Sequence, residues 1–283
     1  MTKEEGLPMS VLKEHLELAN GLTIPLLGFG TWQTPNDVAP AAVRTAIETG
    51  YRHIDTARAY ENEAGVGQGI RASGIPREQL FVTTKVAAQY KTYESAKASI
   101  ETSLQQLDLG YIDLLLIHAP KPWPEMFRDG VPRYFDENVE VWRAMQEAQK
   151  RGDVRSLGVS NFDVDDIANI TSRCEVAPVA NQIRFHIGFT QDEVSGYCHS
   201  RDIVVEAYSP LGTGRLLVDP MLATMAAAYE VSVAQLCIRY TLQRGMVSLP
   251  KSTHPDYIRQ NTQVNFRLAA SDMAALDAMS FDR

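Results

Sequence analysis

The sequence predicts an α/β fold, and within that class a closed (β/α)8 barrel of the TIM-barrel type. Short apolar strands alternate with helix-periodic segments from residue 26 onward, and eight such strand–helix units can be counted. The run Leu114-Leu115-Leu116-Ile117 is apolar throughout, as a parallel strand covered on both faces is. A length of 283 residues suits one barrel, so we expect a single domain over residues 1–283. An open doubly wound sheet is the structural alternative.

Apolar periodicity and turn residues predict the elements in order. The pair Asn20-Gly21 predicts a β-hairpin over residues 14–23, which would cap the amino-terminal mouth of the barrel. Strands are expected over residues 26–30, 53–57, 81–86, 112–118, 154–160, 179–186, 203–209 and 246–251. Helices are expected over residues 40–48, 62–73, 93–107, 139–150, 164–171, 191–200, 221–243, 255–263 and 271–279, with a break near Val231-Ser232. A loop over residues 119–137 follows the fourth barrel strand.

Charge and cysteine usage exclude several classes of partner. The net charge of −8 argues against nucleic acid and anionic membrane surfaces as partners. Three cysteines, Cys174, Cys198 and Cys237, fit neither a disulfide framework nor a zinc motif, so we expect no metal site. No apolar run is long enough to cross a bilayer. We therefore expect a cytoplasmic monomer that acts on a small molecule.

Complementary polar groups follow three successive strands. Asp55 and Tyr60 follow the second barrel strand, Lys85 ends the third, and His118 ends the fourth. Alone, each residue is more often a helix cap, a surface charge or a structural histidine than a catalytic group. Neighbouring parallel strands lie about 4.8 Å apart, so their ends can bring these groups together. We therefore predict an active site made of Asp55, Tyr60, Lys85 and His118.

These four groups suit the reduction of a carbonyl. Hydride addition leaves negative charge on the carbonyl oxygen, which then needs a proton. Tyr60 holds its proton at neutral pH, and the ammonium of Lys85 would stabilise the phenolate that remains after transfer. Asp55 can keep Lys85 charged and in place, while His118 can donate a hydrogen bond that orients the carbonyl.

The glycine-rich run Gly65-Val66-Gly67-Gln68-Gly69 is not a dinucleotide fingerprint. It lacks the G-x-G-x-x-G spacing and lies within an expected helix instead of following a strand. Close helix packing explains these glycines better. Other strand ends offer polar contacts instead: Ser160-Asn161, Asn181-Gln182, Tyr208 to Gly212, and Lys251 to Thr253. The last two groups lie where barrels commonly bind phosphate.

On these segments the chain resembles the aldo-keto reductases, from Leu26 to Asn261. The most specific segments are residues 50–57 with Tyr60, Lys85, the strand ending in His118, and residues 158–162, 207–212 and 249–252. The compact bacterial members, diketogluconate reductases among them, look most similar. The resemblance implies reduction of aldehydes and ketones, keto sugars included, with NADPH as cofactor and with Asp55, Tyr60, Lys85 and His118 as the catalytic tetrad.

The resemblance also implies the binding residues. It places carboxamide contacts at Ser160, Asn161 and Gln182, and stacking of the nicotinamide on Tyr208. The full set of expected cofactor contacts is Thr31, Asp55, Ser160, Asn161, Gln182, Tyr208, Ser209, Leu211, Gly212, Lys251, Ser252, Thr253, Tyr257, Gln260 and Asn261. Expected substrate contacts are Trp32, Tyr60, His118 and Trp123.

Three positions depart from the family pattern. Ala119 stands where a tryptophan is frequent, Arg184 where an acidic residue is common, and Tyr257 where an arginine commonly lies near the adenosine phosphate. We therefore expect NADPH to be preferred with NADH usable. Two other functions remain open at this point: a Schiff-base aldolase acting through Lys85, and a cofactor-sensing barrel subunit without catalysis.

Overall fold

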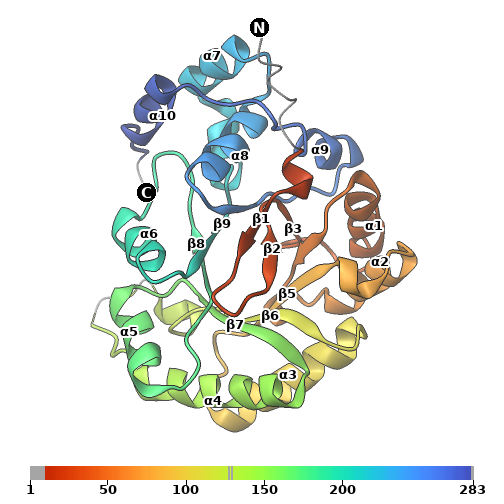
Figure 1. Cartoon of the computed structure of the whole chain (residues 1–283), viewed down its shortest axis with the longest axis vertical. Helices are drawn as coiled ribbons and strands as arrows, with labels where there is room; N and C mark the ends of the chain where they lie inside the picture. Colours follow the sequence, from red (N-terminus) through yellow and green to blue (C-terminus); the bar gives the residue numbers. More distant parts are fainter. Residues whose placement is uncertain (1–9, 127, 129, 282–283) are drawn as a thin grey trace, which may run out of the picture.

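Eight parallel strands form the centre of the molecule (Figure 1). A computed structural model of the chain describes residues 10–126, 128 and 130–281. The strands are β3 (Gly28–Gly30), β4 (His53–Asp55), β5 (Phe81–Val86), β6 (Ile112–Ile117), β7 (Val154–Ser160), β8 (Ala180–Arg184), β9 (Val204–Tyr208) and β10 (Val247–Leu249). They pair in chain order, and a parallel bridge between Leu27 and Ser248 joins the two ends. The barrel prediction is confirmed, and the doubly wound alternative is wrong.

Helices surround the strands on the outside (Figure 1). They are α1 (Ala39–Thr49), α2 (Glu63–Ala72), α3 (Tyr93–Leu107), α4 (Phe135–Arg151), α5 (Val164–Arg173), α6 (Asp192–His199), α7 (Pro220–Ala228), α8 (Val233–Gln243), α9 (Pro255–Gln260) and α10 (Ala270–Asp277). Short 3₁₀ helices are η1 (Val11–Lys13), η2 (Arg58–Tyr60), η3 (Arg77–Gln79), η4 (Trp123–Glu125) and η5 (Gly212–Val218). The break expected near Val231-Ser232 is confirmed, because α7 and α8 meet at 81°.

The expected boundaries differ from the structure most at the start of α4, and smaller differences include β10 and α9, which end two and three residues earlier than expected. Helix α4 begins at Phe135, whereas the sequence placed its start at residue 139. Its first turn carries Asp136 and Glu137, which favour a helix start but lack the apolar periodicity used to find it. The 119–137 loop is also not wholly irregular, because it contains η4. Residues 127 and 129 of this loop lie outside the described residues.

The hairpin covers one end of the barrel. Strands β1 (His15–Glu17) and β2 (Thr23–Pro25) pair antiparallel and cross the middle of the view in Figure 1. Leu18 and Ile24 are buried against a cluster that includes Phe81, Val179 and Val204, which lie where their strands begin. The expected cap over the amino-terminal mouth is confirmed, which leaves the carboxyl ends of the strands for the site.

The glycines of residues 65–69 serve helix packing. A methyl group on Gly65 would lie 2.1 Å from the carbonyl oxygen of Asn36, and one on Gly67 would lie 2.0 Å from that of Leu107. Neither distance leaves room for a side chain. The packing interpretation of this run is therefore confirmed.

Across residues 10–126, 128 and 130–281, no single helix is long and apolar enough to span a membrane. The bent pair α7 and α8 meets that criterion jointly, by length and composition alone.

Candidate active site

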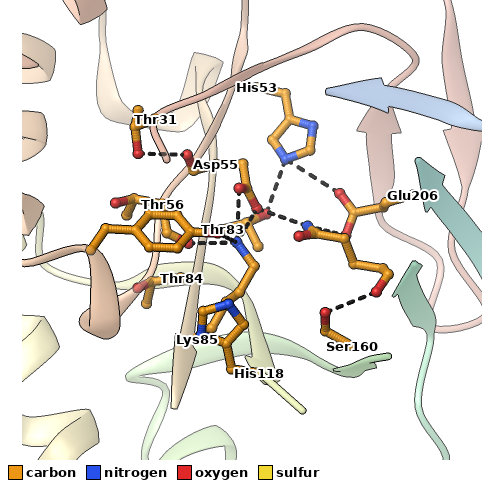
Figure 2. Close-up of polar contacts among 12 residues, drawn as sticks. Thr31, His53, Asp55, Thr56, Thr83, Thr84, Lys85, His118, Ser160 and Glu206 are labelled. Carbon is orange, nitrogen blue, oxygen red and sulfur yellow. Dashed lines mark hydrogen bonds and ion pairs between the residues drawn. The ribbon is translucent and has the colours of Figure 1, made fainter. Parts of the chain in front are cut away.

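Lys85 is the centre of a buried polar cluster at the carboxyl ends of β4, β5 and β6. Its Nζ donates to both carboxylate oxygens of Asp55, at 2.7 and 2.8 Å, and to the carbonyl of Thr56 at 2.8 Å. The hydroxyl of Tyr60 lies 3.4 Å from the same nitrogen. Figure 2 shows Asp55 and Lys85 converging, with the ring of His118 beside them. The structure thus brings the predicted tetrad together.

Strand register places these groups. Asp55 is the last residue of β4 and pairs with Thr83, two residues before Lys85 on β5. Tyr60 ends the short helix η2, which turns back because Glu61 adopts a left-handed conformation, φ 57°. His118 follows β6, and its amide donates to the carbonyl of Val86 at 3.1 Å. Each group is therefore attached to a strand or to a single turn beyond it.

Burial and charge together set the protonation of this cluster. Burial, the largest effect, opposes the charge on Lys85, but Asp55 together with Tyr60 and Glu206 outweighs it, so the pKa of Lys85 is raised. Burial also raises the pKa of Tyr60, and the opposing effect of Lys85 is smaller. We expected the ammonium to dominate at Tyr60, and the net direction is the opposite because the hydroxyl is shielded from water. Tyr60 is thus protonated and Lys85 charged at neutral pH.

His118 is a neutral imidazole. Burial lowers its pKa, and the charges of Lys85 and Lys91 lower it further. Its ring packs in a T-shaped arrangement against two aromatic rings. Its centroid lies 5.5 Å from that of Tyr60 and 5.3 Å from that of Trp123. Trp123 therefore lies against the predicted site. Ala119 is fully buried.

The polar residues after β7 to β9 are linked to the tetrad and to one another. Ser160 Oγ donates to the carbonyl of Gln182 at 2.8 Å, and the amide of Asn161 donates to the carbonyl of His118 at 3.1 Å. The hydroxyl of Tyr208 donates to Asn161 Oδ1 at 2.8 Å. Gln182 Nε2 donates to Asp55 Oδ1 at 2.8 Å. These side chains form one continuous network from His118 to Asp55.

Thr31 and Trp32 lie on the β3 side of the same rim. The hydroxyl of Thr31 donates to the carbonyl of Asp55 at 2.9 Å, which ties the end of β3 to the site. The side chain of Trp32 is 47% exposed, so it can meet a ligand entering the mouth.

Backbone strain marks the rim of the site. Asn161 and Ser209 follow β7 and β9 with positive φ, at 61° and 52°. In the next turn Gly212 has φ 56°, and a methyl group there would lie 3.0 Å from Leu216 Cγ. Leu211 precedes this turn and is partly buried against the core. Such conformations cost energy and persist where a loop must hold a particular shape, commonly at ligand sites.

The remaining predicted contacts lie in the loop after β10 and along α9, between Lys251 and Asn261. Lys251 Nζ reaches the carbonyl of Gln33 at 3.5 Å, and Ser252 Oγ accepts from the amide of His254 at 3.0 Å. Tyr257 is 57% exposed and its ring lies 4.7 Å from that of His254. Thr253 and Gln260 are exposed, whereas Asn261 is buried.

Arg184 ends β8 and is paired in register with Tyr208. Its guanidinium lies 5.0 Å over the ring of Phe189. The arginine at this departure from the family pattern therefore lies against an aromatic ring at the mouth.

Two buried groups near the tetrad were missed from the sequence. Glu206 and His53 are fully buried, with Glu206 Oε1 3.6 Å from His53 Nε2. The alternation of strand side chains could have found Glu206, because it precedes Tyr208 by two residues and so shares its face. His53 precedes Asp55 in the same way.

The profile of the Aldo/keto reductase family matches residues 26–280. The chain belongs to the aldo/keto reductase family. It is 41% identical to glyoxal reductase of Bacillus subtilis (strain 168) over 273 residues, which cover 96% of this chain and 94% of that protein.

Solved structures agree with this membership. The structure of an aldo/keto reductase from Brucella melitensis superposes with a TM-score of 0.85 at 41% identity, covering 93% of this chain and 98% of that chain. An aldo-keto reductase of Bombyx mori, solved in complex with NADP, gives 0.83 at 37% identity, covering 93% and 92%. This aldo/keto reductase is an oxidoreductase that reduces carbonyl groups with NADPH.

The residues present fit a nicotinamide dinucleotide. Among the described residues, no hydrogen bond engages the amide oxygen of Gln182, whereas its nitrogen is held by Asp55. An amide oxygen fixed in this way can accept from a carboxamide. The turn at Gly212 has a left-handed conformation, φ 56°, and the space that a side chain there would need is filled by Leu216.

Proposed function

We propose that Tyr60 donates the proton in the reduction and that Lys85 and Asp55 prepare it to do so. The observation that carries this proposal is the position of Lys85 Nζ, within 2.8 Å of both Asp55 oxygens and 3.4 Å from the Tyr60 hydroxyl. The ammonium stabilises the phenolate left after proton transfer, and Asp55 holds that ammonium in position. The bound nicotinamide supplies the hydride.

His118 orients the carbonyl in this proposal. Its neutral ring can donate one hydrogen bond to the substrate oxygen, and burial keeps it neutral. Asn161, which donates to the His118 carbonyl, fixes the backbone from which the ring projects. Trp32 and Trp123 form the walls that meet the substrate. A 41% identical relative named glyoxal reductase supports small aldehydes as the first substrates to test, with keto sugars next.

The cofactor lies along the rim in the same proposal. Tyr208 stacks on the nicotinamide, Ser160, Asn161 and Gln182 hold its carboxamide, and the turn at Ser209–Gly212 holds the pyrophosphate. Lys251, Ser252 and Thr253 face the adenosine phosphate, together with the segment from Tyr257 to Asn261. The same barrel domain binds both ligands.

The protein acts as a cytoplasmic monomer in this proposal. Cys174, Cys198 and Cys237 are all free thiols, which suits a reducing compartment.

A Schiff-base mechanism at Lys85 is disfavoured by its charge. A lysine nucleophile must lose its proton, but Asp55 raises the pKa of Lys85. Borohydride would consequently fail to trap a carbonyl compound on Lys85.

Tyr60→Phe tests the proposal. It removes the transferred proton and keeps the ring, so kcat for aldehyde reduction falls by at least about 10²-fold, the lower range for a general acid. The loss of NADPH absorbance measures kcat, and tryptophan fluorescence shows that NADPH still binds.

Tyr93→Phe is the matched control. Tyr93 also donates from its hydroxyl, to Glu147 on the outside of the barrel. This variant keeps the kcat of the original enzyme. A Tyr60→Phe enzyme within a few-fold of the original would remove Tyr60 from the role of proton donor.

A further inference from the structure

Beneath the tetrad, inside the barrel, lies a carboxyl group that the reaction as described does not use. Glu206 comes from the middle of β9 and is fully buried. Its Oε2 accepts from Gln182 Nε2 at 3.3 Å, and Gln182 Nε2 also donates to Asp55 Oδ1 at 2.8 Å. The two amide hydrogens of Gln182 thus have one carboxyl acceptor each. Gln182 connects Glu206 directly to the tetrad.

The surroundings of Glu206 give it little to balance a negative charge. Within the part of the chain that the structure describes, Oε1 has no hydrogen-bond partner and faces His53 Nε2 at 3.6 Å (Figure 2). His53 is held neutral, because burial and then Lys85 lower its pKa to about 3. Lys85 has its ammonium committed to Asp55 and to the Thr56 carbonyl. An ionised carboxylate is costly to bury without a paired cation.

We propose that Glu206 is a positioning residue for carbonyl reduction, which it serves as a neutral carboxylic acid that holds the Gln182 amide on Asp55. This inference rests on the proposed roles of Asp55, Lys85 and Tyr60. In this neutral acid, Oε2 accepts from Gln182, while Oε1 lies 3.6 Å from His53 Nε2, a nitrogen that is itself 3.0 Å from Thr83 Oγ1. Gln182 is thereby fixed with its nitrogen toward the barrel and its oxygen toward the mouth.

Loss of the Glu206 proton would disturb the tetrad in two ways. A carboxylate attracts the Gln182 amide more strongly than a neutral acid does, so it competes with Asp55 for that amide. It also adds a negative charge beside the neutral Asp55–Lys85 pair, which disfavours the Tyr60 phenolate and makes Tyr60 a weaker acid. Burial first, and then the Asp55 charge, raise the pKa of Glu206 to about 8.

The groups that face Glu206 come from four elements. His53 and Asp55 belong to β4, Lys85 to β5 and Gln182 to β8, and Tyr60 on η2 lies beyond Lys85. The pKa of Glu206 lies just above neutrality, where His53 remains neutral and Lys85 remains charged.

The experiment is the pH dependence of kcat with saturating NADPH and a small aldehyde. The original enzyme loses about threefold or more of its kcat between about pH 7 and about pH 9, as Glu206 ionises. Glu206→Gln keeps an acceptor for Gln182 but cannot ionise, so its kcat stays within about twofold over this window. KM for NADPH changes little, which separates this effect from lost cofactor binding.

Glu63→Gln is the matched control. Glu63 is also buried and accepts from Thr84 at 2.6 Å, but it makes no hydrogen bond to Gln182. Its variant retains the decline of kcat. A decline that persists in Glu206→Gln, one that disappears in Glu63→Gln, or an original enzyme with no decline would overturn the proposal.

An infrared measurement tests the protonation of Glu206 without turnover. Near neutral pH, the difference spectrum between the original protein and Glu206→Gln shows the carbonyl stretch of a protonated carboxylic acid. Equal intensity of this band in the two proteins would show that Glu206 is ionised and would sink the inference. An enzyme that reduces no carbonyl at all would contradict the proposed function, while this band would still report on Glu206.

Discussion

At the scale of single residues, we propose that Tyr257 sets how strongly the 2′-phosphate of the cofactor is recognised. Its side chain is 57% exposed and leans on the ring of His254, so it is free to meet a ligand at the rim. The nearby Arg259 pairs with Asp256 at 2.6 Å. We therefore propose that Lys251, more than Arg259, supplies the positive charge for the 2′-phosphate.

Tyr257→Arg is expected to tighten NADPH more than NADH. Arginine offers a planar fork of donors that suits a phosphate, which tyrosine lacks. A charge-assisted hydrogen bond contributes about 1.5–3 kcal/mol, so the ratio of the two dissociation constants should change about tenfold or more. Titration of both cofactors by tryptophan fluorescence measures the ratio.

Thr262→Arg is the control for added charge. Thr262 lies in the same segment but lines a shallow groove with Thr45 and Glu48, away from Lys251. Thr262→Arg should leave the ratio of the NADPH and NADH dissociation constants unchanged. Equal tightening of both cofactors by Tyr257→Arg would show that residue 257 does not face the 2′-phosphate.

At the scale of elements, a buried lysine fixes the loop that follows β6. Lys91 Nζ donates to the carbonyl of Ala119 at 2.8 Å and to Asn138 Oδ1 at 2.7 Å. Asn138, on α4, donates in turn to the carbonyl of Pro120 at 2.9 Å. The two side chains thus hold the backbone directly after His118. Burial lowers the pKa of Lys91 from 10.5 to about 7.

Lys91→Met is expected to change how stability depends on pH. Between about pH 7 and 10.5 the unfolded chain binds a proton at Lys91 that the folded protein does not, so stability of the original protein rises with pH there. The contribution is at most about 1.4 kcal/mol per pH unit. Urea unfolding near pH 7 and near pH 9 should show that the free energy of unfolding of the original protein, relative to that of the variant, is larger at pH 9.

Lys13→Met controls for the loss of an ordinary lysine, because Lys13 is exposed. The free energy of unfolding of Lys13→Met should differ from that of the original protein by the same amount at both pH values. The hydrogen bonds lost in Lys91→Met affect both measurements alike and cancel in the comparison. Parallel curves for Lys91→Met as well would mean that Lys91 is not neutral near pH 9.

The same scale shows what the sequence could and could not predict. Apolar runs such as residues 112–117 and the break before α8 were found because their patterns are local. The start of α4 was missed because charged residues open its first turn. The tetrad could be predicted because each member ends a strand or lies one turn beyond it.

Contacts between distant segments were beyond local patterns. Glu206 meets Gln182 and His53 only because the barrel closes, and Lys91 finds Asn138 across the 119–137 loop. The direction of the Tyr60 pKa also depended on burial, which the sequence of η2 does not display. The sequence lacked information on which strands come together when the barrel closes, more than information on residue type.

At the scale of the whole molecule, the two mouths of the barrel have separate tasks. The amino-terminal mouth is closed by the hairpin, where Leu18 and Ile24 are 1% and 0% exposed. The carboxyl-terminal mouth carries the tetrad, the strained rim and the exposed Trp32. Barrels in general place stability at the first end and chemistry at the second.

Leu18→Ala is therefore expected to weaken the fold and spare catalysis. Removing a buried leucine side chain costs about 2–5 kcal/mol, because a cavity remains. The folded variant should keep kcat and KM within about twofold, since the strands separate Leu18 from the tetrad. Trp32→Ala should do the reverse, raising KM for a small aldehyde with little effect on stability, because Trp32 is 47% exposed. Urea unfolding and steady-state kinetics on both variants measure this division, and a Leu18→Ala enzyme that stays folded but loses kcat would show that the hairpin also shapes the active site.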